Sequence, residues 1–176
     1  ALPIFIEAVK KNKDQALFDY TKKFDQYALN AENIQVTRGE IKEAYRSLDP
    51  VLIDVLKQSA ENIRSFHSKQ LRNSWFDAKE DGTILGMKIT PIAKAGVYVP
   101  GGKAAYPSSV LMNVIPAKVA GVGEVIMTTP PGRTGKINPG TLVAADIAGV
   151  DKIYKVGGAQ AIAALAFGTE LIPKVD

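Results

Sequence analysis

A strand-like run, a Gly- or Pro-rich turn and a helical stretch follow one another three times in the second half of the chain, and this repeat constrains the fold most. The runs AGVYV, EVIMTT and KIYKV begin at Ala95, Glu124 and Lys152, so they recur about every thirty residues. Each is rich in β-branched or aromatic residues and leads to a turn, written PGG, PPG or GG. Strands that alternate with helices at this spacing indicate βαβ units and a parallel sheet.

The sequence after each turn is typical of a helix. The stretches are SSVLMNVIPAKVAGV, NPGTLVAADIAG and AQAIAALAFG. Pro116 lies inside the first and predicts a kink or a break there, because proline lacks an N–H and its ring clashes with the preceding turn. In the second, Asn138 is a good N-cap and Pro139 suits the first helical position.

The first seventy or so residues carry helical patterns instead. Ala16, Leu17, Tyr20 and Phe24 recur at steps of three and four, which places them on one stripe of a helix that ends at Asp25. We therefore expect this part of the chain to add a layer of helices to the sheet.

Two further helices begin with recognisable caps. Thr37 and Glu40 have the spacing of a capping box, and Asp49 before Pro50 caps a helix that runs to about His67. Apolar residues continue one face of each helix: Ile41, Ala44, Tyr45 and Leu48 in the first, and Leu52, Val55, Leu56, Ile63 and Phe66 in the second.

The apolar faces around Leu17, Leu52 and Leu56 should meet the sheet, another chain or solvent, and large exposed patches would indicate a partner outside this chain. The turn EDGT, from Glu80 to Thr83, separates the Trp75 region from ILGMKIT. It predicts a β-hairpin near residues 75–90.

Charge and composition exclude several classes of protein. The 22 basic and 18 acidic residues leave a net charge of +4, and the lysines are dispersed, whereas a nucleic-acid surface needs clustered positive charge. No apolar run is long enough to span a bilayer, and the amino-terminal sequence lacks the layout of a signal peptide. There is no cysteine, so disulfides are excluded. We expect neither nucleic acid nor a membrane as a partner.

The glycine-rich turns are the candidate ligand site. Right-handed crossovers place all three turns at the carboxyl edge of the sheet, where open α/β sheets bind ligands. Gly101-Gly102 and Gly157-Gly158 would let the main chain approach a ligand, and the positive ends of the following helices favour a phosphate. PGGKAA is not the GxGxxG fingerprint, and a Gly-Gly pair also suits an ordinary tight turn.

Two side chains fall at the same edge. Tyr98 lies at the end of its strand, and Gln160 follows the last glycine pair. Either could contact a ligand. Tyr98 could instead be a core aromatic residue, and Gln160 could simply cap its helix.

Two long motifs of this chain resemble the histidinol dehydrogenase family. They are VYVPGGKAAYPSSVLMNVIPAKVAGV and VGGAQAIAALAFGTELIPKVD, and the upstream pieces DQALFDYTKKFD and NIRSFH are also similar. The resemblance covers nearly all of the chain. It implies an α/β fold in which a helical segment, residues 1–94 with the hairpin near 75–90, precedes an incomplete Rossmann-like parallel sheet with flanking helices, residues 95–176.

The resemblance also implies a function. Members of the family oxidise L-histidinol through an aldehyde to L-histidine, the last step of histidine biosynthesis, with two NAD in sequence; they are zinc-dependent homodimers, expected in the cytoplasm. Carried over by motif, Tyr98 of VYVPGG and Gln160 of GGAQA are NAD contacts. This chain would supply the NAD-positioning part of such an enzyme.

The resemblance places the zinc ligands and the catalytic Glu-His pair beyond Asp176, so no catalytic or metal-binding residue is assigned here and the chain alone is expected to be inactive. A zinc site usually needs three or four ligands, and His67 is the only histidine. We interpret His67 as a packed or surface residue. The alternatives are a non-catalytic nucleotide-binding module and a structural domain that self-associates through its helices.

Overall fold

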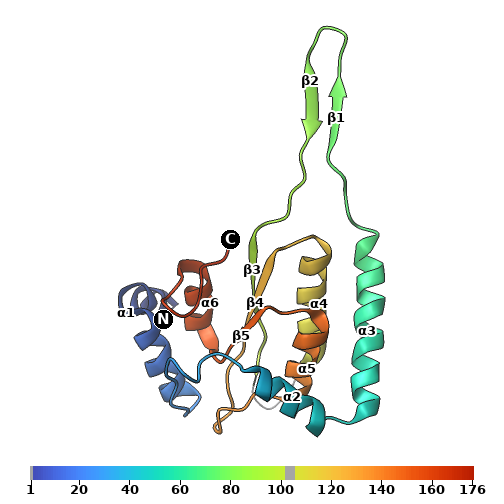
Figure 1. The fold of residues 1–176 in the computed structure, drawn as a ribbon. Helices are drawn as coiled ribbons and strands as arrows, with labels where there is room; N and C mark the ends of the chain where they lie inside the picture. Colours follow the sequence, from blue (N-terminus) through green and yellow to red (C-terminus); the bar gives the residue numbers. More distant parts are fainter. Residues whose placement is uncertain (1, 102–105) are drawn as a thin grey trace.

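The computed structural model describes residues 2–101 and 106–176. The helices are α1 (Leu2–Phe24), α2 (Arg38–Ser47), α3 (Pro50–Ser68), α4 (Pro107–Val119), α5 (Pro139–Ala148) and α6 (Gly158–Phe167). The strands are β1 (Trp75–Ala78), β2 (Ile84–Met87), β3 (Lys94–Tyr98), β4 (Glu124–Thr128) and β5 (Lys152–Tyr154). Figure 1 shows helices around a small sheet, with β1 and β2 projecting from this body as a long arm.

The repeat in the second half forms a parallel sheet, as predicted. The strand order is β3-β4-β5, and both pairs are parallel. Tyr98 pairs with Thr128, and Thr128 with Tyr154, so the carboxyl ends of the strands are level. The α/β fold class is therefore confirmed.

Helices cover both faces of the sheet. Successive side chains of a strand point to opposite faces. Val125 and Met127 therefore join a hydrophobic cluster with α2, α3, α4 and α5, whereas Ile126 joins a second cluster with α1 and α6. Residues 1–94 contribute helices to both clusters. The domain boundary between residues 94 and 95 remains a prediction from the sequence.

Both outer strands bond to segments beyond the sheet. Along β5, the Val36 N–H donates to the Ile153 carbonyl (2.9 Å) and the Lys155 N–H donates to the Ile34 carbonyl (2.8 Å). Beside β3, the Asp176 carboxylate accepts the N–H groups of Ala93 and Lys94, both at 2.9 Å. A backbone bridge between Gln35 and Tyr154 thus lies beside β5, and the Asp176 side chain holds the start of β3.

The predicted helix starts are confirmed. The Thr37 hydroxyl accepts the Glu40 N–H (3.2 Å) while the Glu40 carboxylate accepts the Thr37 N–H (2.8 Å), which is the reciprocal capping box. Asp49 caps α3, with Pro50 in its first turn. The first helix ends at Phe24 as expected, but the backbone at Lys13 (φ +48°) interrupts its helical geometry, which the sequence pattern does not predict.

The predicted apolar stripes are covered only in part. Leu17 and Leu56 are buried, but Leu52, Val55 and Phe66 are 41%, 53% and 61% exposed. One side of α3 therefore faces α4 and α5, and the adjoining side carries apolar residues that face solvent.

Pro116 was predicted to kink or break its helix; the break is wrong, and the kink stays a prediction. The α4 helix continues through Pro116 and ends at Val119. Pro116 lies in the last turn, where the missing N–H removes only the bond to the Met112 carbonyl and few residues follow it. Because Met112 is 54% exposed, solvent can reach this part of the helix.

The hairpin predicted near residues 75–90 is confirmed. β1 and β2 pair antiparallel, and the Lys79 N–H donates to the Thr83 carbonyl (2.9 Å) across the turn. Gly82 has φ +84°, a conformation that favours glycine.

Candidate functional site

The candidate site lies where the parallel strands end. Tyr98 is the last residue of β3, and Gly158 is the first residue of α6, which follows β5. The Gly158 N–H donates to the Tyr98 hydroxyl (3.4 Å), although about sixty residues separate them in the chain. The prediction that these turns meet at one edge of the sheet is therefore confirmed.

A pocket of about 360 Å³ opens at this edge. Its walls come from α1, from the turn after β4 and from the start of α6. The lining residues are Phe5, Phe24, Asp25, Tyr98, Pro130, Gly157, Gly158, Ala159 and Gln160. The structure thus brings both predicted site residues, Tyr98 and Gln160, to one cavity.

Gln160 is almost fully buried, at 2% exposure, in the first turn of α6. Its side chain folds back over the start of the helix. The Gln160 Oε1 atom lies so close to Gly158 that a Cβ atom there would be only 2.8 Å from it. Gly158 also has φ +68°. Glycine at this position therefore makes room for the amide group of Gln160 beside the pocket.

Gly101 and Gly157 both pack against Pro130. A Cβ atom on Gly101 would lie 2.7 Å from the Pro130 Cγ atom, and one on Gly157 would lie 2.5 Å from the Pro130 Cβ atom. Two of the glycines in the motifs are thus explained by tight packing of three strand-end turns, which was the alternative interpretation. Gly102 lies outside the described residues.

Helix α1 also contributes to the pocket, which the sequence patterns did not predict. Phe24 belongs to the predicted helical stripe, and its ring lies 5.9 Å from the ring of Tyr20 and 6.0 Å from that of Phe5. Asp25 follows the helix directly, and burial raises the pKa of its carboxyl group. The only signal in the sequence was the aspartate at the helix end, which by itself does not indicate a site.

The described residues do not form a zinc site. Across residues 2–101 and 106–176, no cluster of three or more His, Cys, Asp or Glu side chains could hold a metal ion. His67 lies near the end of α3, where its Nδ1 atom is 2.7 Å from the Gln70 Oε1 atom. None of the helices in these described residues combines the length and the hydropathy of a transmembrane segment.

Comparison with known proteins gives the family. The model of the histidinol dehydrogenase family matches residues 3–176. The chain belongs to the histidinol dehydrogenase family. It is 59% identical over 171 residues to the histidinol dehydrogenase of Clostridium acetobutylicum, covering 97% of this chain and 39% of that protein. It is 58% identical over 171 residues to that of Bacillus subtilis, covering 97% of this chain and 40% of that protein.

A solved structure in the histidinol dehydrogenase family has the same fold. The crystal structure of histidinol dehydrogenase from Elizabethkingia anophelis matches with a TM-score of 0.93 at 40% identity, over 99% of this chain and 40% of that one. The chain therefore spans about two fifths of the length of the relatives it matches. It corresponds to an amino-terminal part of a histidinol dehydrogenase, as the motifs predicted.

Proposed function

We propose that this chain positions NAD in a full-length enzyme that oxidises L-histidinol to L-histidine in histidine biosynthesis. The observation that carries the proposal is the pocket at the sheet edge, where Tyr98 bonds the start of α6 beside Gln160. The zinc ligands and the catalytic residues would come from elsewhere in the protein, which we propose to be a cytoplasmic homodimer.

The chain's own groups suit part of a dinucleotide. The amino-terminal end of α6 carries a partial positive charge and N–H groups that favour a phosphate. The Tyr98 ring would lie against the nucleotide, and the Gln160 amide can both donate and accept hydrogen bonds. Asp25, which also lines the pocket, would accept hydrogen bonds from ribose hydroxyls.

Bound NAD would accept a hydride, and the conversion of an alcohol to a carboxylate releases two, so each turnover needs two NAD. The residues described here would hold and orient the dinucleotide. Because no described cluster fits zinc, we assign no step of the reaction to a metal in this chain.

The role of Gln160 can be tested in the full-length protein with Gln160→Ala. Loss of one neutral hydrogen bond typically costs about 0.5–1.5 kcal/mol, so we expect calorimetry to show NAD affinity several-fold weaker. Zinc content, measured by atomic absorption, should stay the same. Gln58→Ala, at an exposed site on α3, is the matched control. Unchanged NAD affinity in the Gln160 variant would refute this role.

A non-catalytic nucleotide-binding module is the second candidate. The pocket at the sheet edge and the glycine-rich turns around it would serve such a module equally well. Turnover of L-histidinol by the full-length protein with zinc and NAD would exclude it, whereas NAD binding without turnover would support it.

A further inference from the structure

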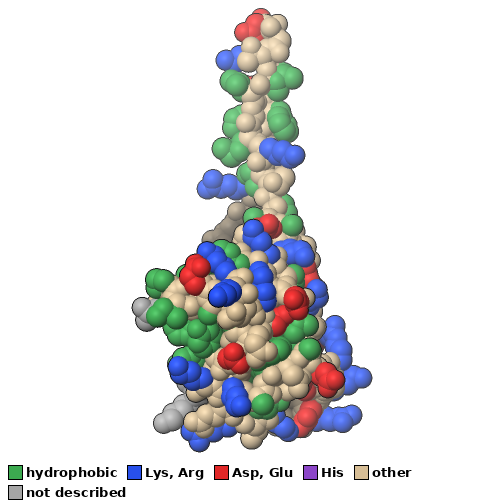
Figure 2. Space-filling model, turned by 90° about the vertical axis from the view of Figure 1, so that its left-hand side faces the viewer, with side chains coloured by type: hydrophobic (Ala, Val, Ile, Leu, Met, Phe, Trp, Pro, Cys, Tyr) green, Lys and Arg blue, Asp and Glu red, His purple; other side chains and the backbone are tan. Residues whose placement is uncertain are grey.

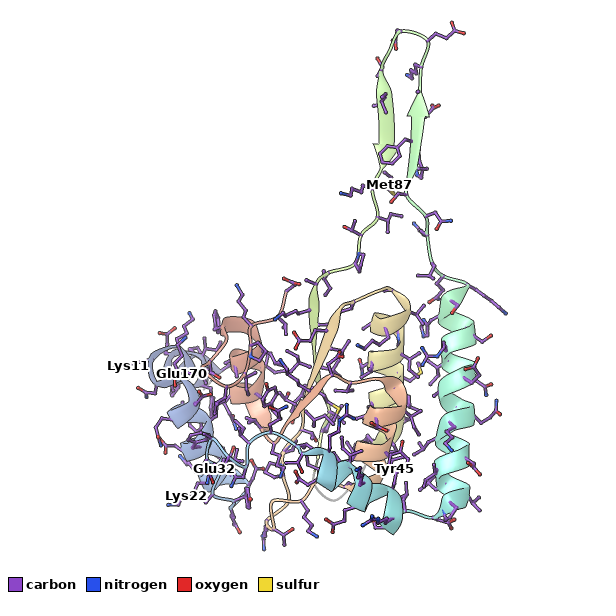
Figure 3. All side chains as sticks on the ribbon, viewed as in Figure 1. Lys11, Lys22, Glu32, Tyr45, Met87 and Glu170 are labelled. Atoms are coloured by element: carbon purple, nitrogen blue, oxygen red, sulfur yellow. The ribbon has the colours of Figure 1, made fainter. Side chains whose placement is uncertain are left out.

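The arm formed by β1 and β2 has no partner within the part of the chain that the structure describes. Its side chains project into solvent along its whole length (Figure 2), and Met87 at its base lies clear of the body (Figure 3). The exposed fractions are Trp75 54%, Phe76 69%, Ile84 68%, Leu85 53% and Met87 50%.

Both faces of the arm are apolar. The register pairs Trp75 with Met87 and Asp77 with Leu85 on one face, and Phe76 with Gly86 and Ala78 with Ile84 on the other. A hairpin that packs on its own domain with one face and meets water with the other has one apolar face and one polar face. Two apolar faces indicate that this arm is enclosed between surfaces.

An isolated two-stranded hairpin is marginally stable in water, and large exposed apolar patches mark interaction sites. The arm is included in the 99% of the chain that matches the solved relative. The arm therefore has a counterpart in that relative, of whose chain this match covers 40%.

The base of the arm lies next to the last residue of this chain. The Asp176 carboxylate accepts the N–H groups of Ala93 and Lys94, which follow the arm, and Figure 1 shows the carboxyl terminus at the end of the body from which the arm projects. The relatives are more than twice as long as this chain, since it covers only 39–40% of them. Their additional chain therefore continues within reach of the arm.

A cavity of about 350 Å³ beside the base offers a place for that chain to begin packing. Leu71, Ile89 and Pro91 line it together with Arg72. Leu71 and Ile89 are themselves 56% and 39% exposed, so apolar surface continues from the cavity onto the arm.

We propose that the β1–β2 arm is enclosed by the part of the full-length protein that follows residue 176 in the same chain. Covalent connection gives that part a high effective concentration at the base of the arm, which a second copy lacks. The enclosed arm would join the NAD-positioning part of the protein to the rest.

Trp75, the only tryptophan of residues 1–176, reports on this contact. The test compares the full-length protein with its Trp75→Phe variant, so that the difference spectrum isolates the emission of Trp75 from that of any other tryptophan. We expect emission shifted to the blue, and acrylamide quenching several-fold weaker than for a free indole. Both should be independent of protein concentration.

Two outcomes would overturn the proposal. Quenching of Trp75 as strong as that of a free indole would show an uncovered arm, and protection that falls on dilution would show a second copy as the cover. If Trp75→Phe does not fold, hydrogen exchange of the wild-type protein serves instead. Fast exchange of the outward-facing amides of residues 75–78 and 84–87 would then refute enclosure. Loss of NAD binding is a separate outcome and does not bear on the arm.

Discussion

Pro130 is the residue against which the turns at the carboxyl edge of the sheet pack. Gly101 and Gly157 approach it from the turns after β3 and β5, so close that a methyl group on either would overlap it. The repeat of glycine-rich turns could be read from the sequence, but the reason for the glycines could not. Pro130 belongs to a different turn from either glycine, and only the paired strands bring the three together.

Gly157→Ala tests this packing. The added Cβ atom would lie 2.5 Å from Pro130, so the turns must shift, and overpacking of this kind typically costs about 1–3 kcal/mol in the free energy of unfolding. Gly39→Ala is the control, because its Cβ atom would have only the Thr37 hydroxyl nearby, at 3.6 Å. In urea denaturation we expect the first to destabilise and the second to be neutral or stabilising. Equal effects would contradict the role given to Pro130.

The α2 and α5 helices are joined by a polar contact at the edge of an apolar interface. The Tyr45 hydroxyl donates to the Asp146 carboxylate (3.0 Å), and Figure 3 shows Tyr45 on α2 at the side of the body near α5. The sequence predicted Tyr45 on an apolar face, which is correct for its ring. Its hydrogen bond could not be predicted, because the acceptor lies about a hundred residues away.

This contact predicts a dependence of stability on alkaline pH. Burial and the neighbouring Asp146 raise the pKa of Tyr45 to about 12. Unfolded tyrosine ionises near pH 10. The contribution of Tyr45 to the free energy of unfolding is therefore fully present below about pH 10 and is lost as the pH rises through about 12. In thermal melts across alkaline pH, the melting temperature of Tyr45→Phe should fall less than that of the wild-type protein. Identical pH profiles for the variant and the wild type would contradict the role of Tyr45.

The whole molecule is organised around the sheet, with the first part of the chain wrapped over both of its faces. Lys155, at the end of β5, is 5% exposed and pairs with Glu40 of the α2 capping box. Burial alone would raise the pKa of Glu40, but hydrogen bonds from Lys155 and from the Thr37 backbone outweigh it and lower that pKa. This pair ties the amino-terminal helices to the sheet.

Glu40→Gln tests the ion pair between Lys155 and Glu40. Glutamine keeps the capping box but leaves the buried Lys155 ammonium group without its carboxylate partner. Since the Glu40 side chain is 28% exposed, we expect a loss of up to about 3 kcal/mol in the free energy of unfolding. Glu43→Gln, in the exposed pair with Lys136, should have little effect. Adding Lys155→Met to Glu40→Gln should restore most of the stability, and a further loss would refute the assignment.

The same pair adds a dependence on acid. The pKa of Glu40 is lower in the folded protein than in the unfolded chain. The ionised Glu40 therefore stabilises the fold fully at a pH above the ordinary pKa of glutamate. This stabilisation is lost as the pH falls through the lowered pKa of the folded protein. The Glu40→Gln variant should lack that part of the acid transition.

The sequence by itself determined the helices, the hairpin, the parallel sheet and the edge at which Tyr98 and Gln160 lie. These features follow from patterns and caps that act over a few residues, and from the right-handed connection of parallel strands. Only the tertiary structure decided that Asp25 joins the pocket, that the α4 helix continues through Pro116 and that the arm projects without cover. Each of these depends on the packing of segments distant in the chain, which no local pattern encodes.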